Sequence, residues 1–253
     1  PSDFGCYLSA VIPFSLIAFF GKFIGKKYLR FLFLGLFTLL FICLMLTVSR
    51  GAWFAFIASM LLMCIWIKAL GVLFLIIGLF IIITQQFYDP YLKERLTKFF
   101  ILEEQSSKDR LMIWGVAKNM FISRPWVGVG IGTFMFNFDR FLTKVYPYGI
   151  PYAHNCYLQM AAETGIIGLV SFLTILALFF YKGIRVLTKK EMSFSWYVLL
   201  AILASVLGYS VQMGLDTNFY SLDLGMLFWL LLGAGVAAMK LASVNSTNVK
   251  VEI

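Results

Sequence analysis

The stretch "FLFLGLFTLLFICLMLTVSRGAWFAFIASMLLMCIWI", from Phe31 to Ile67, decides the fold class, because Arg50 is its one charged residue. A helix needs about 17–25 mostly apolar residues to cross a bilayer. The stretch holds one such run on each side of "SRG" at residues 49–51. It therefore predicts two membrane helices joined at an arginine.

The composition extends this prediction to the whole chain. Of the 253 residues, 61% are hydrophobic and 13% are charged, and the mean hydropathy is +0.90. A soluble domain is about half apolar and about a quarter charged. The runs that approach or reach spanning length are 4–20, 31–48, 51–67, 69–84, 165–181, 196–213 and 224–239. We therefore predict an all-α fold, a polytopic membrane helix bundle with about seven spans.

Basic residues beside these runs predict the orientation. They are Lys22, Lys26, Lys27, Arg30, Lys68, Lys182, Arg185, Lys189, Lys190 and Lys240, and all fall on one side if the runs alternate. By the positive-inside rule that side is cytoplasmic. The net charge of +9 is explained in this way. We therefore expect membrane lipids as partners and no nucleic acid.

The same alternation predicts four parts of the chain. Residues 1–84 form the first transmembrane helices, 85–164 an external loop, 165–243 further transmembrane helices, and 244–253 a cytoplasmic tail. Because the sequence begins with Pro1 and not with Met, we interpret it as the C-terminal portion of a longer protein.

The external loop contains a predicted amphipathic helix. Ser106 and Asp109 have the spacing of a capping box, and the proline of "SRP" at residues 123–125 ends the helix. An apolar stripe follows at Ile113, Ala117, Met120 and Phe121. The neighbouring face carries Arg110, Trp114 and Lys118. Such a helix either lies along a membrane surface with solvated charges, or presents its cations to a ligand.

The next segment, "VGVGIGTF", contains Gly128, Gly130 and Gly132. A tight turn packed on the membrane helices is the favoured interpretation. The alternative is a nest of backbone N–H groups that faces an anion. The dinucleotide fingerprint needs a strand before it, a helix after it and an acidic residue about 20 positions on. Because the segment is expected outside the membrane, we do not expect a nicotinamide site here.

The only histidine, His154, lies in "PYAHNCYLQMAAETGIIG" at residues 151–168. We expect a helix to start near Asn155, with Asn155, Gln159 and Glu163 on one face. A polar face that enters a membrane should point at a water-filled cavity or at other protein. His154 is then either a hydrogen-bonded structural residue or a general base.

Arg50 has two interpretations as well. An arginine on the side opposite the positive-inside bias either reaches lipid phosphate or binds an anion in a site. Its guanidinium group offers two parallel donors to a phosphate. Arg110, Lys118 and Arg124 of the external loop could join it there.

Three stretches together resemble the O-antigen ligase and O-antigen polymerase family of bacterial membrane glycosyltransferases. They are "SRGAWFAF", "DRLMIWGVAKNMFISRPWVGVGIGTF" and "AHNCYLQMAAETGIIGLVSF", in matching order across roughly residues 40 to 180. The resemblance implies an enzyme of the cytoplasmic (inner) membrane with its active site on the outer face. It would move a glycan from an undecaprenyl-diphosphate carrier to an acceptor hydroxyl, on lipid A core in ligases or on the next repeat unit in polymerases.

The resemblance also implies roles for residues. His154 matches the base-like residue of the "AHN" motif, and Arg50 and Arg110 match diphosphate binders. We expect substrate contacts from Asn155, Gln159, Glu163, Lys118, Arg124, Gly128 and Gly130. The sequence has no DxD motif and no ligand cluster with metal spacing, so we expect metal-independent transfer without a cofactor. The alternative function is a polysaccharide or lipid-linked glycan transporter or flippase, which would also explain many spans.

Overall fold

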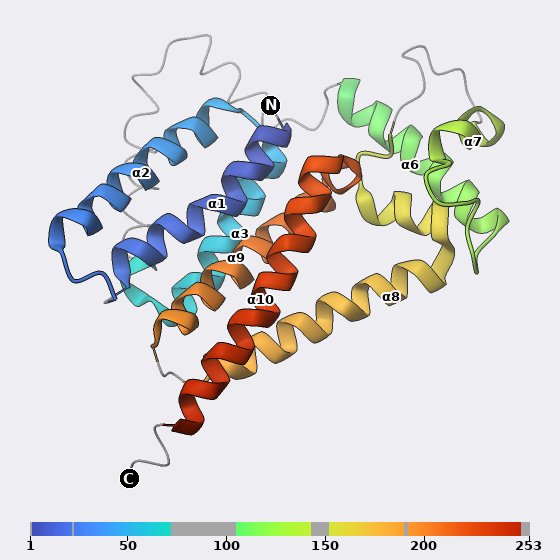
Figure 1. Cartoon of the computed structure of the whole chain (residues 1–253). Helices are drawn as coiled ribbons and strands as arrows, with labels where there is room; N and C mark the ends of the chain where they lie inside the picture. Colours follow the sequence, from blue (N-terminus) through green and yellow to red (C-terminus); the bar gives the residue numbers. More distant parts are fainter. Residues whose placement is uncertain (1, 22, 72–104, 143–151, 190–191, 249–253) are drawn as a thin grey trace, which may run out of the picture. The chain divides into compact units, whose positions relative to one another are not determined.

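A computed structural model describes residues 2–21, 23–71, 105–142, 152–189 and 192–248, without the side chains of 105–108 and 244–248. Every regular element in these ranges is a helix (Figure 1). The helices are α1 (Ser2–Phe20), α2 (Lys27–Leu46), α3 (Arg50–Trp66), α6 (Gln105–Ser123), α7 (Phe134–Phe141), α8 (Cys156–Leu187), α9 (Phe194–Met213), the 3₁₀ helix η2 (Asn218–Tyr220) and α10 (Leu222–Asn248). The predicted all-α class is confirmed.

Five of these helices, α1, α2, α8, α9 and α10, are long and apolar enough to cross a membrane. Helix α3 is apolar but shorter, with 17 residues. Most of the predicted run at 69–84 lies outside the described residues. The chain is a multi-pass membrane protein, while the count of seven spans and the external position of 85–164 stay predictions.

The chain divides into two compact units, residues 1–63 with 172–253, and residues 64–171. The division falls within α8, beyond a break at Gly165, where φ is +66° and ψ is −167°. The predicted apolar run at 165–181 begins at this break. The four predicted parts, with boundaries at 84, 164 and 243, remain predictions.

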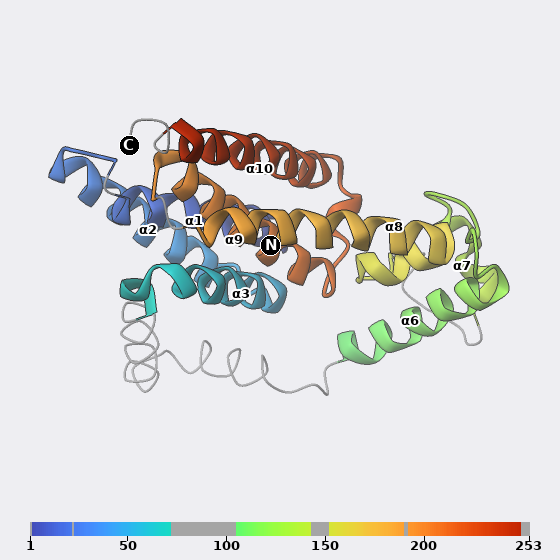
Figure 2. The same cartoon turned by 90° about the horizontal axis from the view of Figure 1, so that it is seen from below.

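Helix α9 forms the core of the first unit and lies between α3 and α10 (Figure 2). Two serine hydroxyl groups join α9 to neighbouring helices inside the apolar bundle. Ser205 Oγ donates to the Ala10 carbonyl oxygen of α1 at 2.6 Å. Ser59 Oγ of α3 donates to the Ala204 carbonyl oxygen of α9 at 2.7 Å. Small hydroxyl residues are common at membrane helix interfaces, because they allow close packing and bond across it.

The second unit is built around the predicted amphipathic helix, which is α6. Its expected stripe is buried at Ile113, Ala117 and Met120 and packs with Phe134 and Phe138 of α7. The helix ends at Ser123, as the following proline predicts. The expected cap at Ser106 concerns a side chain outside the described residues. Helix α6 therefore uses its apolar stripe to hold the next segment of its own chain.

Candidate functional site

The second unit presents His154 at the start of α8. The helix starts at Cys156, beside Asn155 as predicted, and Asn155 Oδ1 caps it by accepting a hydrogen bond from the Leu158 N–H at 3.0 Å. His154 directly precedes this cap, is half-buried and has a φ of +47°. Left-handed backbone is uncommon outside glycine, although histidine and asparagine adopt it more often than most residues.

The residue before the histidine, Ala153, is held through both of its backbone groups. Its N–H donates to Gln159 Oε1 at 3.3 Å, and its carbonyl oxygen accepts from Trp114 Nε1 at 2.9 Å. Ala153 is fully buried. With Asn155 fixed as the helix cap, the backbone on both sides of His154 is constrained. We call residues 153–155 the histidine turn.

A chain of hydrogen bonds continues from the histidine turn through the polar face of α8. Gln159 Nε2 donates to Glu163 Oε1 at 3.3 Å. The Glu163 carboxylate also accepts from the backbone N–H of Gly132 at 3.0 Å and of Phe134 at 3.1 Å. Gln159 and Glu163 are each 1% exposed, so this polar face contacts protein. The Glu163 carboxylate therefore has three hydrogen-bond donors inside the protein.

The glycine segment, residues 125–133, packs on the break in α8. At Gly165 the helix leaves its regular path, and the carbonyl oxygens of Ala162 and Glu163 accept from Val129 N–H at 2.9 Å and Gly130 N–H at 3.0 Å. A Cβ atom on Gly128 would collide with the backbone of Glu163. Gly128 also has a φ of +70°, so glycine suits this position for space and for conformation.

The "VGVGIGTF" segment is a tight turn on α8. The N–H groups of Gly132 and Phe134 face a carboxylate of the same chain, that of Glu163, which lies at the N-terminal end of α7. Carboxylates are favourable at helix N-termini, where the free N–H groups and the helix dipole are positive. A nest for an anion of the substrate stays a prediction.

The expected cations of the external loop lie in different surroundings. Arg110 is half-buried on α6, one helical turn before Trp114, the residue that holds the histidine turn. Lys118, one turn beyond Trp114, and Arg124, just after the helix, are exposed. The face of α6 with Arg110 and Lys118 is therefore the face that reaches Ala153.

Arg50 belongs to the first unit and is the first residue of α3. Ser49 Oγ accepts from the Ala52 N–H at 3.4 Å and so caps the helix, while Val48 before it has a φ of +49°. Arg50 is half-buried as a residue and begins a helix, and the backbone N–H groups of a helix N-terminus favour anions. The "SRG" turn therefore has an arginine at a helix start, which is the feature that its proposed role uses.

The sequence of this chain is similar to a known protein family. A family model described as O-antigen ligase matches residues 34–173. The chain belongs to the O-antigen ligase family. No protein of curated function matches its sequence. The match includes Arg50, Arg110 and His154 and ends within α8.

Membership in the O-antigen ligase family gives this chain a general role in membrane glycan transfer and a lipid-linked glycan context. The resemblance inferred from the three sequence stretches is thereby confirmed. The roles of individual residues in this family member stay proposals. Among the described residues, no group of three His, Cys, Asp or Glu side chains is arranged to hold a metal ion, and metal independence stays a prediction.

Two polar residues of the first unit of this O-antigen ligase family member were not singled out from its sequence, and one of them, Gln212, lies beside the "SRG" turn. Gln212 of α9 lies 3.4 Å from where a Cβ atom on Gly51 would be, and its Nε2 donates to the Ser2 carbonyl oxygen at 3.1 Å. Asn218 Nδ2 donates to Asp3 Oδ1 at 2.6 Å. The amide oxygens of Gln212 and Asn218 are buried without a donor among the described residues. A glutamine inside the apolar run 196–213 was the available signal.

Proposed function

We propose that this protein transfers a glycan from an undecaprenyl-diphosphate carrier to an acceptor hydroxyl, with His154 as the general base. The proposal rests on the hydrogen-bond chain from Glu163 through Gln159 to Ala153, which constrains the backbone beside the one histidine of the sequence. His154 lies within the matched family region. Imidazole is the commonest general base near neutral pH.

The reaction needs proton removal at one end and charge stabilisation at the other. The acceptor oxygen attacks the anomeric carbon of the glycan, and the bond from that carbon to the diphosphate oxygen breaks. The acceptor's proton passes to the neutral imidazole of His154. The carrier leaves as a lipid diphosphate that takes the bonding electrons, so cationic donors near it lower the barrier.

Arg50 and Arg110 are the proposed diphosphate binders. Arginine pairs with phosphate oxygens through two parallel N–H groups and keeps its charge throughout the reaction. Arg50 has the added N–H groups of the α3 N-terminus. Arg110 lies one turn from Trp114. Two such cations would supply the electrostatic role of a divalent metal, so transfer should proceed without one.

The remaining predicted site residues divide by exposure. Lys118 and Arg124 are exposed and are proposed to contact phosphate of the donor. Gln159 and Glu163 are buried, and their burial favours a positioning role for them, with Asn155 as the helix cap. Gly128 and Gly130 bring the backbone of their segment to α8. In this proposal the substrate contacts the histidine turn, and the glycine segment packs on α8 and helps to position that turn.

Transfer and translocation are distinguished by one reconstituted assay. Purified protein in liposomes receives a lipid-diphosphate glycan on one side, with an acceptor carrying a free hydroxyl. Transfer joins glycan to acceptor and releases the carrier diphosphate, and it should persist in excess chelator. Movement of intact donor across the bilayer without a new glycosidic bond would overturn the proposal in favour of the flippase alternative. Activity that depends on added magnesium or manganese would overturn metal independence alone.

The proposed location is the outer face of the bacterial cytoplasmic membrane, with lipid A core or a repeat unit as acceptor. Single cysteines at Ile122 and Lys26, in a background without native cysteines, test the face. Ile122 is exposed in the second unit, and Lys26 is exposed between α1 and α2. An impermeant thiol reagent on intact cells should label Ile122→Cys only. Labelling of Lys26→Cys alone would reverse the topology.

A further inference from the structure

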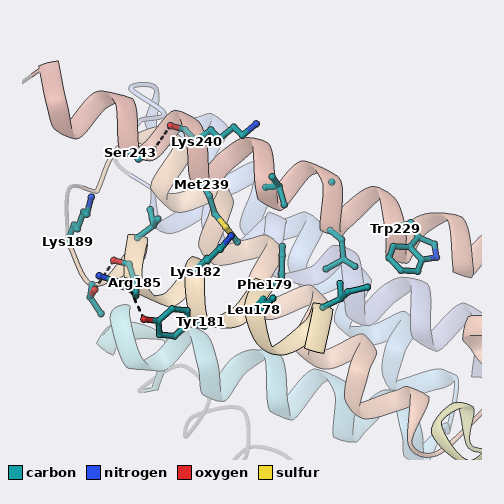
Figure 3. A pocket seen from close by; sticks show the side chains of 16 residues that line it. Leu178, Phe179, Tyr181, Lys182, Arg185, Lys189, Trp229, Met239, Lys240 and Ser243 are labelled. Carbon is teal, nitrogen blue, oxygen red and sulfur yellow. Dashed lines mark hydrogen bonds between the residues drawn. The ribbon is translucent and has the colours of Figure 1, made fainter. Parts of the chain in front are cut away.

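The first unit contains an open groove that the proposed reaction does not use. It lies between the C-terminal half of α8 and α10 and has a volume of about 1090 Å³ (Figure 3). Both helices are among those long and apolar enough to span a membrane. The groove therefore opens along a surface that would face lipid.

One end of the groove is apolar. Phe179 and Leu232 form a buried floor, each 6% exposed, while Leu178 and Trp229 stand about half exposed at the walls. Trp229 is fixed by edge contacts with the ring of Phe172, at a centroid distance of 6.4 Å. An apolar surface of this kind is suited to a hydrocarbon chain.

The other end of the groove is cationic. Lys182 and Arg185 lie one turn apart at the end of α8, Lys189 lies in the turn that follows this helix, and Lys240 comes from α10. Arg185 Nη1 donates to the Tyr181 hydroxyl at 3.2 Å, and its guanidinium lies 5.5 Å from the centre of that ring. None of the described residues that line the groove is acidic. Figure 3 shows Arg185, Lys189 and Lys240 toward one end and Trp229 toward the other.

The cations alone have a simpler explanation. Positive charge at a helix C-terminus complements the helix dipole, and positive charge on cytoplasmic loops orients a membrane protein. Neither effect requires an apolar groove that continues from the charges. Trp229 and Lys240 are separated by about 16 Å along α10, from a rise of 1.5 Å per residue. This matches about half of a hydrocarbon core roughly 30 Å thick, which is one leaflet.

We propose that this groove binds an anionic phospholipid of the cytoplasmic leaflet. Its phosphate contacts Arg185, Lys182, Lys189 and Lys240, and one acyl chain lies along the apolar end toward Trp229. Charge complementarity selects this occupant, because four cations without an acidic residue among the described lining of the groove favour an anionic headgroup over a zwitterionic one. The proposal concerns the first unit alone and does not depend on the proposed transfer reaction.

The experiment uses photoreactive phosphatidylglycerol with a diazirine in its acyl chain, and the matching phosphatidylcholine probe. Full-length protein is reconstituted in phosphatidylcholine nanodiscs with a trace of either probe, illuminated and digested for peptide mass spectrometry. Phosphatidylglycerol should label peptides of α8 and α10 that line the groove, and excess unlabelled phosphatidylglycerol should compete. The phosphatidylcholine probe should label them at least several-fold less.

Gly233 provides a variant that fills the groove. A Cβ atom there meets nothing within 4 Å, so a side chain can start at this position without a clash. Gly233 lines the groove, and Gly233→Leu is designed to occupy its apolar end. Gly35 of α2 is equally open and lies outside the groove, so Gly35→Leu is the matched control. Labelling by phosphatidylglycerol should fall several-fold in Gly233→Leu and stay unchanged in Gly35→Leu.

The charge test compares two double variants. In the first, Lys182 and Arg185 of the groove are both replaced by glutamine. In the second, Lys26 and Lys27, two exposed cations elsewhere, are both replaced by glutamine. Groove labelling by phosphatidylglycerol should fall about tenfold in the first pair only, given the contribution of each basic residue near an anionic lipid. Three results would overturn the proposal. They are equal labelling of the wild-type groove by both probes, groove labelling that stays unchanged in Gly233→Leu, and phosphatidylglycerol labelling of another protein segment in place of the groove.

Discussion

The histidine turn and the "SRG" turn have the same backbone plan and differ in the position of the residue that is proposed to act in the reaction. In each, a left-handed residue precedes a side chain that caps a helix. The left-handed residues are Val48 before α3 and His154 before α8, and the caps are Ser49 and Asn155. A third example is Met192, which precedes the cap Ser193 of α9.

This repetition shows that a left-handed residue is a way to start a helix in this protein and is not by itself a sign of a site. The three residues have φ values of +49°, +47° and +42°. What distinguishes the histidine turn is its surroundings, since Ala153 is bonded through both backbone groups and Gln159 connects it to Glu163. In the "SRG" turn the functional candidate is instead Arg50, two residues after the strained position.

The largest effect is expected from His154→Asn. Asparagine also adopts left-handed backbone, so the turn keeps its conformation while losing the group that accepts the proton. Transfer should fall by about 10²–10⁴-fold, which is the usual contribution of general acid–base catalysis. Donor binding, measured with a labelled lipid-diphosphate glycan, should be retained.

The control for this variant is Tyr152→Phe, which changes an exposed side chain two residues away. Its transfer rate should be near that of the wild type. A well-folded His154→Asn protein with near-normal turnover would return the histidine to a structural role. The histidine turn would then have no catalytic group that distinguishes it from the "SRG" turn.

The next effect in size is expected at the arginines. Arg50→Ala and Arg110→Ala should each lower transfer by about 10²-fold, comparable to removing one donor that stabilises developing negative charge. Because the diphosphate is charged before the reaction, both should also weaken donor binding, unlike His154→Asn. Arg→Lys variants keep the charge and lose the paired N–H groups, so they should lie between. Normal donor affinity in Arg50→Ala would remove the "SRG" turn from the site.

The sequence predicted the parts of this comparison that depend on local pattern. Apolar runs predicted the spanning helices, and helical spacing predicted the buried stripe of α6. Pro125 predicted where α6 ends. The polar face at Asn155, Gln159 and Glu163 was also visible. Its partners were not, because the N–H groups of Gly132 and Phe134 approach Glu163 only through tertiary folding.

The break at Gly165 was hidden for a similar reason. A glycine inside an apolar run is usually compatible with a continuous helix. The break is stabilised by the glycine segment, because the Pro125 carbonyl oxygen accepts a hydrogen bond from the Ile166 N–H at 2.8 Å. The groove depends in the same way on α8 and α10 meeting, which no local pattern in either helix encodes.

A moderate effect on stability is expected from Glu163→Gln. The carboxylate accepts from three donors, and the amide would direct its own N–H group at one of them. The second unit should lose about 1–3 kcal/mol, the usual cost of a buried hydrogen-bonding group left unpaired. Thermal unfolding measures this, with the exposed Asp139→Asn of α7 as control. Transfer should fall through misplacement of the histidine turn, and an unchanged unfolding temperature would contradict the network.

The smallest effect separates backbone strain from chemistry. Replacing Val48, Met192 or His154 by glycine relieves a left-handed conformation worth about 1–2 kcal/mol. Glycine also loses more backbone entropy on folding, by about 0.5–1 kcal/mol, so each net change in stability should stay within about 1 kcal/mol. Unfolding measurements on the three variants should therefore agree closely. Transfer should be kept in Val48→Gly and Met192→Gly and lost in His154→Gly. Loss of transfer in Val48→Gly with unchanged stability would show that the left-handed conformation of Val48 positions Arg50. Left-handed backbone would then matter for transfer in both turns.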